Sequence, residues 1–117
     1  MRDDKENIIV QKTFEFSIEI ISFTEELRDS KKFEMASQLF KSGTSIGANV
    51  REAQNSESTA DFIHKFKIAA KEADETQYWL ELCEKSEFLP QPKPQLIKDL
   101  NSIMKIIYKI ISSAKKR

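Results

Sequence analysis

The sequence predicts an all-α fold, an antiparallel up-down four-helix bundle, in one domain that spans residues 1–117. The chain has only 2 glycines and 3 prolines, and these are residues that the turns of a sheet require. Apolar residues recur with a 3.6-residue period in four long segments. Long amphipathic helices joined by short connections are typical of antiparallel bundles.

The first segment, from about Asp4 to Ser30, carries two adjacent apolar stripes. Acidic residues precede it and are expected to cap its start, and Arg28 suits its end. One stripe consists of Val10, Phe14, Ile18 and Ile21, and the other of Phe16, Ile20, Phe23 and Leu27. Two stripes are more than one bundle core can bury, so this segment predicts self-association.

The second segment, from about Glu34 to Ser56, contains both glycines, Gly43 and Gly47, one turn apart. An interior glycine destabilises a helix by about 1 kcal/mol relative to alanine. The pair therefore indicates the close approach of another backbone, and a local bend is the alternative. The apolar side is formed by Met35, Leu39, Ile46, Val50 and Ala53.

The third segment begins at Ser58 or Thr59 and ends near Glu87. Ser58 and Asp61 have the spacing of an N-cap and an acidic N3 residue, a weaker form of the capping box. Three prolines at 90, 92 and 94 then interrupt the helix, and we expect the only sizeable break at Glu87–Lys93. The apolar stripe consists of Phe62, Phe66, Ala69, Ala73, Thr76, Leu80 and Cys83.

The fourth segment, from about Pro94 to Ala114, is apolar over more than half of its circumference. That width also predicts an interface with another chain. The main stripe consists of Leu96, Leu100, Ile103, Ile107, Ile110 and Ala114, and the second of Ile97, Met104, Tyr108 and Ile111. A basic tail, residues 112–117, follows.

Charge is balanced over the whole chain, with 19 basic and 19 acidic residues, but it is unevenly distributed. Residues 90–117 carry seven basic and one acidic side chain, a net charge of +6. In an oligomer this positive segment would be repeated, which favours RNA or DNA as a partner. A solvated basic helix end is the alternative interpretation. The candidate phosphate contacts are Lys105, Lys109, Lys115, Lys116 and Arg117.

Several function classes are disfavoured. No run approaches the roughly 18 apolar residues of a membrane-spanning helix, and a single cysteine, Cys83, predicts a cytoplasmic protein. The only histidine, His64, forms one Asp-x-x-His pair with Asp61, whereas a di-iron bundle needs two Glu-x-x-His motifs. With no glycine-rich phosphate loop and no base near Cys83, we expect no enzymatic activity, cofactor, metal or small-molecule ligand.

Polar residues at the margins of the apolar stripes of the second and third segments form a candidate structural polar motif. A polar group at such a margin destabilises the fold by about 1–3 kcal/mol unless it finds a partner. We expect hydrogen bonds between helices or between chains, and a ligand site is the alternative. The motif consists of Ser45, Asn49, Arg51, Glu52, Glu72 and Glu75.

Residues 43–53 read Gly-Thr-Ser-Ile-Gly-Ala-Asn-Val-Arg-Glu-Ala. They resemble the Ser-Ile-x-x-Asn-Ile-x-Glu-Gly signature of the four-helix bundle proteins also called the 23S rRNA intervening-sequence protein family. Ala53 stands where that family commonly has glycine, a mild change for a helix. The likeness covers about residues 14–112. It also rests on Leu39, Phe40, Phe62, His64, Lys65, Phe66, Ile68, Ala69, Lys71, Glu72, Ala73, Glu75, Thr76, Tyr78, Trp79 and Leu80.

The resemblance implies an antiparallel bundle that assembles into a homopentameric ring. Some family members are encoded inside insertions in bacterial 23S ribosomal RNA genes, and related accessory proteins of diversity-generating retroelements bind reverse transcriptase and nucleic acid. The predicted function is therefore a non-enzymatic oligomeric scaffold. The alternative is a nucleic-acid-binding accessory factor, with RNA or a reverse transcriptase as partner, that acts through the basic fourth helix.

Overall fold

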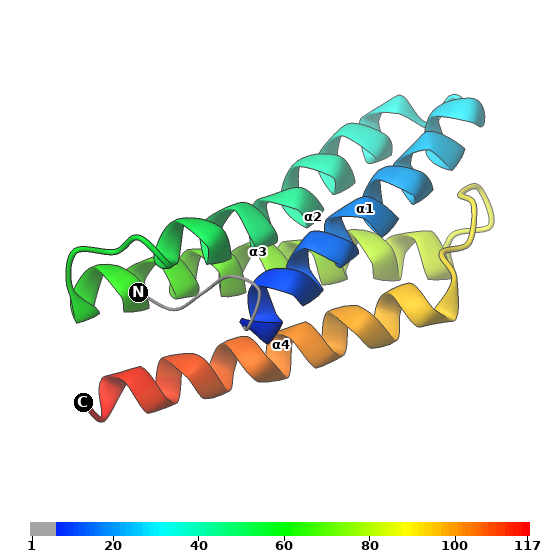
Figure 1. Cartoon of the computed structure of the whole chain (residues 1–117). Helices are drawn as coiled ribbons and strands as arrows, with labels where there is room; N and C mark the ends of the chain where they lie inside the picture. Colours follow the sequence, from blue (N-terminus) through cyan, green and yellow to red (C-terminus); the bar gives the residue numbers. More distant parts are fainter. Residues whose placement is uncertain (1–6) are drawn as a thin grey trace.

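The structure is a computed structural model that describes residues 7–117. These residues form four α-helices and no strand. The helices are α1 (Ile8–Asp29), α2 (Phe33–Ala53), α3 (Thr59–Lys85) and α4 (Pro94–Lys115). Each helix runs opposite to the one before it (Figure 1). The predicted all-α four-helix bundle is confirmed.

Helix α1 begins at Ile8, directly after Asn7. The predicted start at Asp4, and the acidic residues expected to cap it, lie outside the described residues. The helix ends at Asp29, one residue before the predicted end. Lys31 then adopts the left-handed backbone conformation with φ of 63°, which reverses the chain into α2.

Helix α2 ends at Ala53, three residues before the predicted end at Ser56. The N–H groups of residues 54, 55 and 56 donate to the carbonyls of Arg51, Glu52 and Ala53, three residues back in each case. These shorter bonds tighten the last turn and stop the helix. The resulting connection between α2 and α3, residues 54–58, is shorter than the link between α3 and α4, residues 86–93, where the sizeable break was predicted.

The start of α3 matches its prediction, since Ser58 Oγ accepts a 3.0 Å hydrogen bond from the N–H of Asp61. The proline-rich link after α3 is also confirmed. Gln91 Nε2 in this link donates to the carbonyl of Cys83 at 3.0 Å, which fastens the link to the end of α3. Pro94 then opens α4 in the first turn, where a missing N–H costs no helical hydrogen bond.

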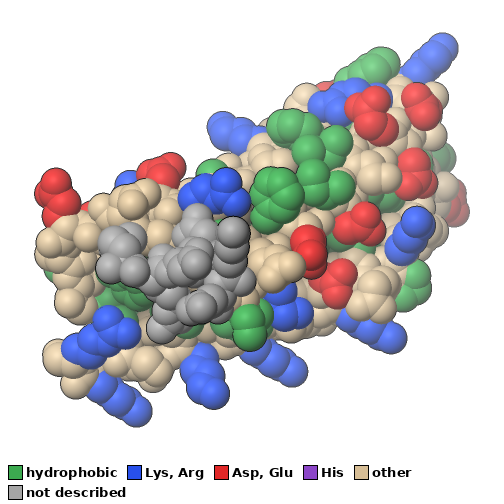
Figure 2. Space-filling model, viewed as in Figure 1, with side chains coloured by type: hydrophobic (Ala, Val, Ile, Leu, Met, Phe, Trp, Pro, Cys, Tyr) green, Lys and Arg blue, Asp and Glu red, His purple; other side chains and the backbone are tan. Residues whose placement is uncertain are grey.

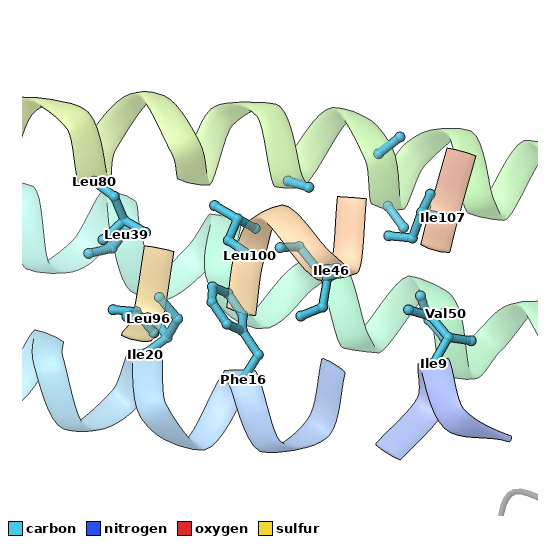
Figure 3. Close-up of a cluster of buried hydrophobic side chains, with 14 of the residues drawn as sticks. Ile9, Phe16, Ile20, Leu39, Ile46, Val50, Leu80, Leu96, Leu100 and Ile107 are labelled. Carbon is cyan, nitrogen blue, oxygen red and sulfur yellow. The ribbon is translucent and has the colours of Figure 1, made fainter. Parts of the chain in front are cut away.

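The core lies between all four helices and consists of aliphatic and phenylalanine side chains (Figure 3). Of the two stripes on α1, the one that contains Phe16 and Ile20 is buried. On α4 the main stripe is buried as expected with one exchange. Ile111 is buried, whereas Ile110, which was expected in its place, is half-buried.

The two glycines of α2 face α1, as the close-approach interpretation predicted. A β-carbon at Gly47 would lie 3.2 Å from the carbonyl oxygen of Thr13, a backbone atom of α1. A β-carbon at Gly43 would lie 2.8 Å from Cγ1 and Cγ2 of Ile20. The glycines therefore allow α1 and α2 to pack at a distance that any larger residue would oppose.

Two buried polar pairs join helices inside the bundle. The hydroxyl oxygens of Ser42 and Thr76 lie 2.9 Å apart and connect α2 to α3. Asn7 Nδ2 donates to Gln54 Oε1 at 2.7 Å, which connects the start of α1 to the end of α2. Neither pair was predicted, because Ser, Thr, Asn and Gln are also common on exposed surfaces.

Candidate functional site

Of the α1 stripe that contains Phe14, three residues lie on the outside of the bundle, whereas the fourth, Val10, is buried in the core. Phe14, Ile18 and Ile21 are 53%, 51% and 38% exposed, and we call these three residues the outer α1 face. Figure 2 shows hydrophobic side chains gathered on the surface over α1 and the adjoining part of α2. Because all three point away from the core, the bundle alone does not account for this stripe.

Two arginines border this region. The guanidinium carbon of Arg51 lies 5.5 Å from the centre of the Phe14 ring, and that of Arg28 lies 5.6 Å from the ring of Phe40 on α2. Both distances suit a cation–π contact. Phe40 is itself 38% exposed, so the apolar surface includes α2 as well as α1.

The wide apolar surface of α4 is mostly absorbed within the bundle. Ile97, Met104, Ile106 and Ile110 are half-buried against the core. The reason is that α4 packs on both α3 and α1, so both of its flanks are covered. The apolar surface that α4 exposes is therefore smaller than its sequence pattern predicted.

Tyr108 is the exposed member of the second α4 stripe, at 48%. Its hydroxyl donates to Asp74 Oδ1 on α3 at 3.3 Å. Partial burial, and then the Asp74 carboxylate, raise the pKa of Tyr108. The hydrogen bond from Tyr108 therefore links α4 to α3.

The candidate phosphate contacts lie along one side of α4 and at its end, and we call them the basic edge. They are Lys105, Lys109, Lys115, Lys116 and Arg117, and all five are exposed. Figure 2 shows Lys and Arg side chains projecting along the edge that α4 forms. Within residues 7–117 the ion pairs are Arg28–Glu25 and Lys65–Glu52, so no cation of the basic edge is neutralised by a carboxylate.

The α2 members of the structural polar motif divide between two kinds of contact. Ser45 Oγ donates to the carbonyl of Lys41 at 2.6 Å, and Asn49 Nδ2 donates to the carbonyl of Ser45 at 2.9 Å, so both bond within α2. Arg51 reaches Phe14 of α1. Glu52 accepts a 3.0 Å hydrogen bond from Lys65 Nζ and so links α2 to α3.

The α3 members of the motif carry negative charge at the margin of the core. Partial burial, and then the nearby Glu75, raise the pKa of Glu72, while Lys41 and Lys71 oppose the rise. Glu75 Oε2 accepts a 3.3 Å hydrogen bond from Trp79 Nε1 within α3. The ionised form of Glu72 is therefore less stable than that of a fully solvated carboxylate.

The residues considered for metal binding and for nucleophilic chemistry, His64 and Cys83, lie in different environments. In the part of the chain that the structure describes, no three His, Cys, Asp or Glu side chains are grouped to hold a metal ion. His64 is exposed. Cys83 is buried, and burial raises the pKa of Cys83 to about 11, so its thiol is protonated at neutral pH. None of the described helices is long and apolar enough to cross a membrane.

The comparisons with known proteins agree with this architecture. A crystal structure of a protein of unknown function, from the S23 ribosomal protein family of Bacteroides thetaiotaomicron, superposes with a TM-score of 0.83 at 42% sequence identity. The similarity covers 88% of this chain and 97% of that one. No curated protein matches the chain. The family model described as 23S rRNA-intervening sequence protein matches residues 5–109, and the chain belongs to that family.

Proposed function

We propose that the chain is the non-enzymatic subunit of a homo-oligomeric scaffold, and that the outer α1 face is a subunit interface. The observation that supports this proposal is the exposure of Phe14, Ile18 and Ile21 in one stripe. Such a stripe is unfavourable in water, and covering it with another protein surface recovers about 25 cal/mol for each Å² buried. A ring of five subunits is what the family resemblance implies.

The bordering arginines suit an interface of this kind. Arg51 and Arg28 already stack on aromatic rings of their own subunit, so their side chains are partly fixed before association. Arginine and aromatic side chains are enriched at the centres of protein interfaces. The free, buried Cys83 fits a scaffold that acts in the reducing cytoplasm.

Sedimentation velocity over a wide range of protein concentrations tests the proposal. We expect the native chain to sediment as an oligomer and the Ile18→Asp variant as a folded monomer, because a charge at the centre of an apolar interface loses its hydration. Phe88→Asp is the matched control. Phe88 is 74% exposed in the α3–α4 link, away from the outer α1 face.

Circular dichroism establishes that both variants keep their helices. A native chain that stays monomeric at all concentrations contradicts the scaffold proposal. An Ile18→Asp variant that remains assembled would leave the scaffold in place but remove the outer α1 face as its interface.

The basic edge supports a second candidate, a nucleic-acid-binding accessory factor. Its exposed cations carry no ion-paired carboxylate within residues 7–117, so each is free to neutralise a phosphate. The acidic balance of residues 1–31 and 59–89, net −3 each, opposes binding elsewhere on the chain. Affinity that comes from phosphate contacts falls steeply as salt rises and depends little on base sequence.

Filter binding with a structured RNA and a duplex DNA at low salt tests this second candidate. The double variant Lys105→Glu/Lys116→Glu should bind more weakly and show a shallower salt dependence than the native chain. Lys67→Glu on α3 is the control for net charge, and it should retain most of the affinity. If no complex is retained at about 10⁻⁴ M protein, the weak end of non-specific affinities, the candidate is eliminated.

A further inference from the structure

A cavity of about 720 Å³ lies at the end of the bundle where the start of α1, the α2–α3 connection and the last turns of α4 meet. Its volume is in the range of ligand cavities, about 300–1,000 Å³. The cavity does not include the outer α1 face. It shares Lys109 and Arg117 with the basic edge.

The wall of this cavity is largely hydrocarbon. Phe62 and Phe66 of α3 contribute neighbouring rings whose centres are 4.8 Å apart. Ile106 and Ile110 of α4 line it from the other side, which explains why these two residues are only half-buried. A wall of this kind favours an aliphatic or aromatic ligand body.

The mouth of the cavity carries cations. Lys109 lines it, and Arg117 is held there with its guanidinium carbon 6.0 Å from the centre of the Phe62 ring. Within residues 7–117, Glu57 is the acidic residue in the lining. Among these residues the two cations outnumber the acidic side chain, and the mouth is suited to a ligand with an anionic end.

Ser56 adds an unsatisfied polar group. Its Oγ is buried, and it has no hydrogen-bond partner within residues 7–117. Buried hydroxyls are normally satisfied, so this group has an unused donor. Ser56 also lines the cavity, so rotation of its side chain can bring the hydroxyl to a ligand oxygen that supplies the missing partner.

Together, the apolar wall and the cations at the mouth indicate an amphiphilic ligand, with an apolar body and an anionic end. We propose that the cavity binds a free carboxylate with a long aliphatic chain. The chain packs against Phe62, Phe66 and Ile110, and the carboxylate is held by Lys109, Arg117 and Ser56.

Isothermal titration calorimetry of the full chain with sodium dodecanoate, below its micelle concentration, tests the proposal. We expect saturable binding with a negative heat-capacity change, the mark of buried apolar surface. Dodecanol should bind roughly tenfold more weakly, because it lacks the charge that the cations recognise. Dodecyltrimethylammonium should bind more weakly still.

Variants separate the site from adsorption elsewhere. Lys109→Glu should weaken dodecanoate binding by roughly tenfold or more. Lys98→Glu makes the same charge change on an exposed residue of α4 that does not line the cavity, and it should leave the affinity unchanged. Ile110→Trp should reduce binding by filling space, and circular dichroism checks that its helices remain.

Three outcomes overturn the proposal. The first is no dodecanoate binding by the native chain. The second is equal affinity for dodecanoate, dodecanol and dodecyltrimethylammonium, which means that the mouth does not select charge. The third is binding to phosphatidylglycerol vesicles without binding to dodecanoate, which assigns the cations to a membrane headgroup instead of a free carboxylate.

Discussion

The Phe16→Ala variant is expected to lose about 3–5 kcal/mol of its free energy of unfolding. Phe16 is 2% exposed and lies in the middle of the core, with Ile20 on the same helix and Leu100 on α4 (Figure 3). Truncation removes the transfer free energy of the ring and leaves a void that the helices fill only in part. Since a domain is stable by only about 5–15 kcal/mol, this change is a large fraction of the total.

Urea denaturation followed by circular dichroism, at equal protein concentration, measures this loss. Phe88→Ala is the control, because it removes the same ring from an exposed position and should change the stability by less than about 0.5 kcal/mol. A Phe16→Ala loss as small as that of the control would mean that Phe16 is not in the core.

Gly43→Ala is expected to destabilise the protein although alanine is the better helix former. The added β-carbon would lie 2.8 Å from Cγ1 and Cγ2 of Ile20, both next to the branch point of a side chain that is 0% exposed. Those atoms cannot move away without displacing α1. Overpacking of this kind costs about 1–3 kcal/mol, which exceeds the gain in helix propensity of at most about 1 kcal/mol.

Two further variants isolate the steric cause. Ala48→Gly, at an exposed position of the same helix, measures the propensity alone and should destabilise by about 1 kcal/mol or less. In an Ile20→Ala background the clash is gone, so Gly43→Ala should become neutral or stabilising. If Gly43→Ala stabilises the native chain as well, the close packing of α1 and α2 at this position is refuted.

Much of the fold was predictable because local chemistry determines it. Ser58 is an N-cap in the structure because its hydroxyl accepts the exposed N–H of Asp61, and this requires only residues close in sequence. Helix α3 ends at Lys85, and Pro90 and Pro92 keep the following link from resuming a helix for an equally local reason. The end of α2 was misplaced because residues 54–56 contain no glycine or proline, and the tighter turn there leaves no mark in the sequence.

The candidate site was predictable only in part. Periodicity revealed both stripes of α1, but only packing decides that Phe16 faces the core and Phe14 faces outward. The charges of the basic edge were plain from the sequence, and their exposure follows from their place on α4. The cavity left no signal, because its walls come from three separated parts of the chain.

The helix contacts of the bundle are of two kinds, which differ in the size of the residues that form them. Where α2 meets α1 the contacts include two glycines, Gly43 and Gly47, whereas α4 contributes bulky residues such as Leu100 and Ile107 to the core. Exchanges among Leu, Ile and Met usually cost less than about 1.5 kcal/mol, but nothing smaller than glycine exists to replace it. The inner face of α4 can therefore change among aliphatic residues at small cost, whereas any residue larger than glycine at position 43 of α2 meets the Ile20 side chain of α1.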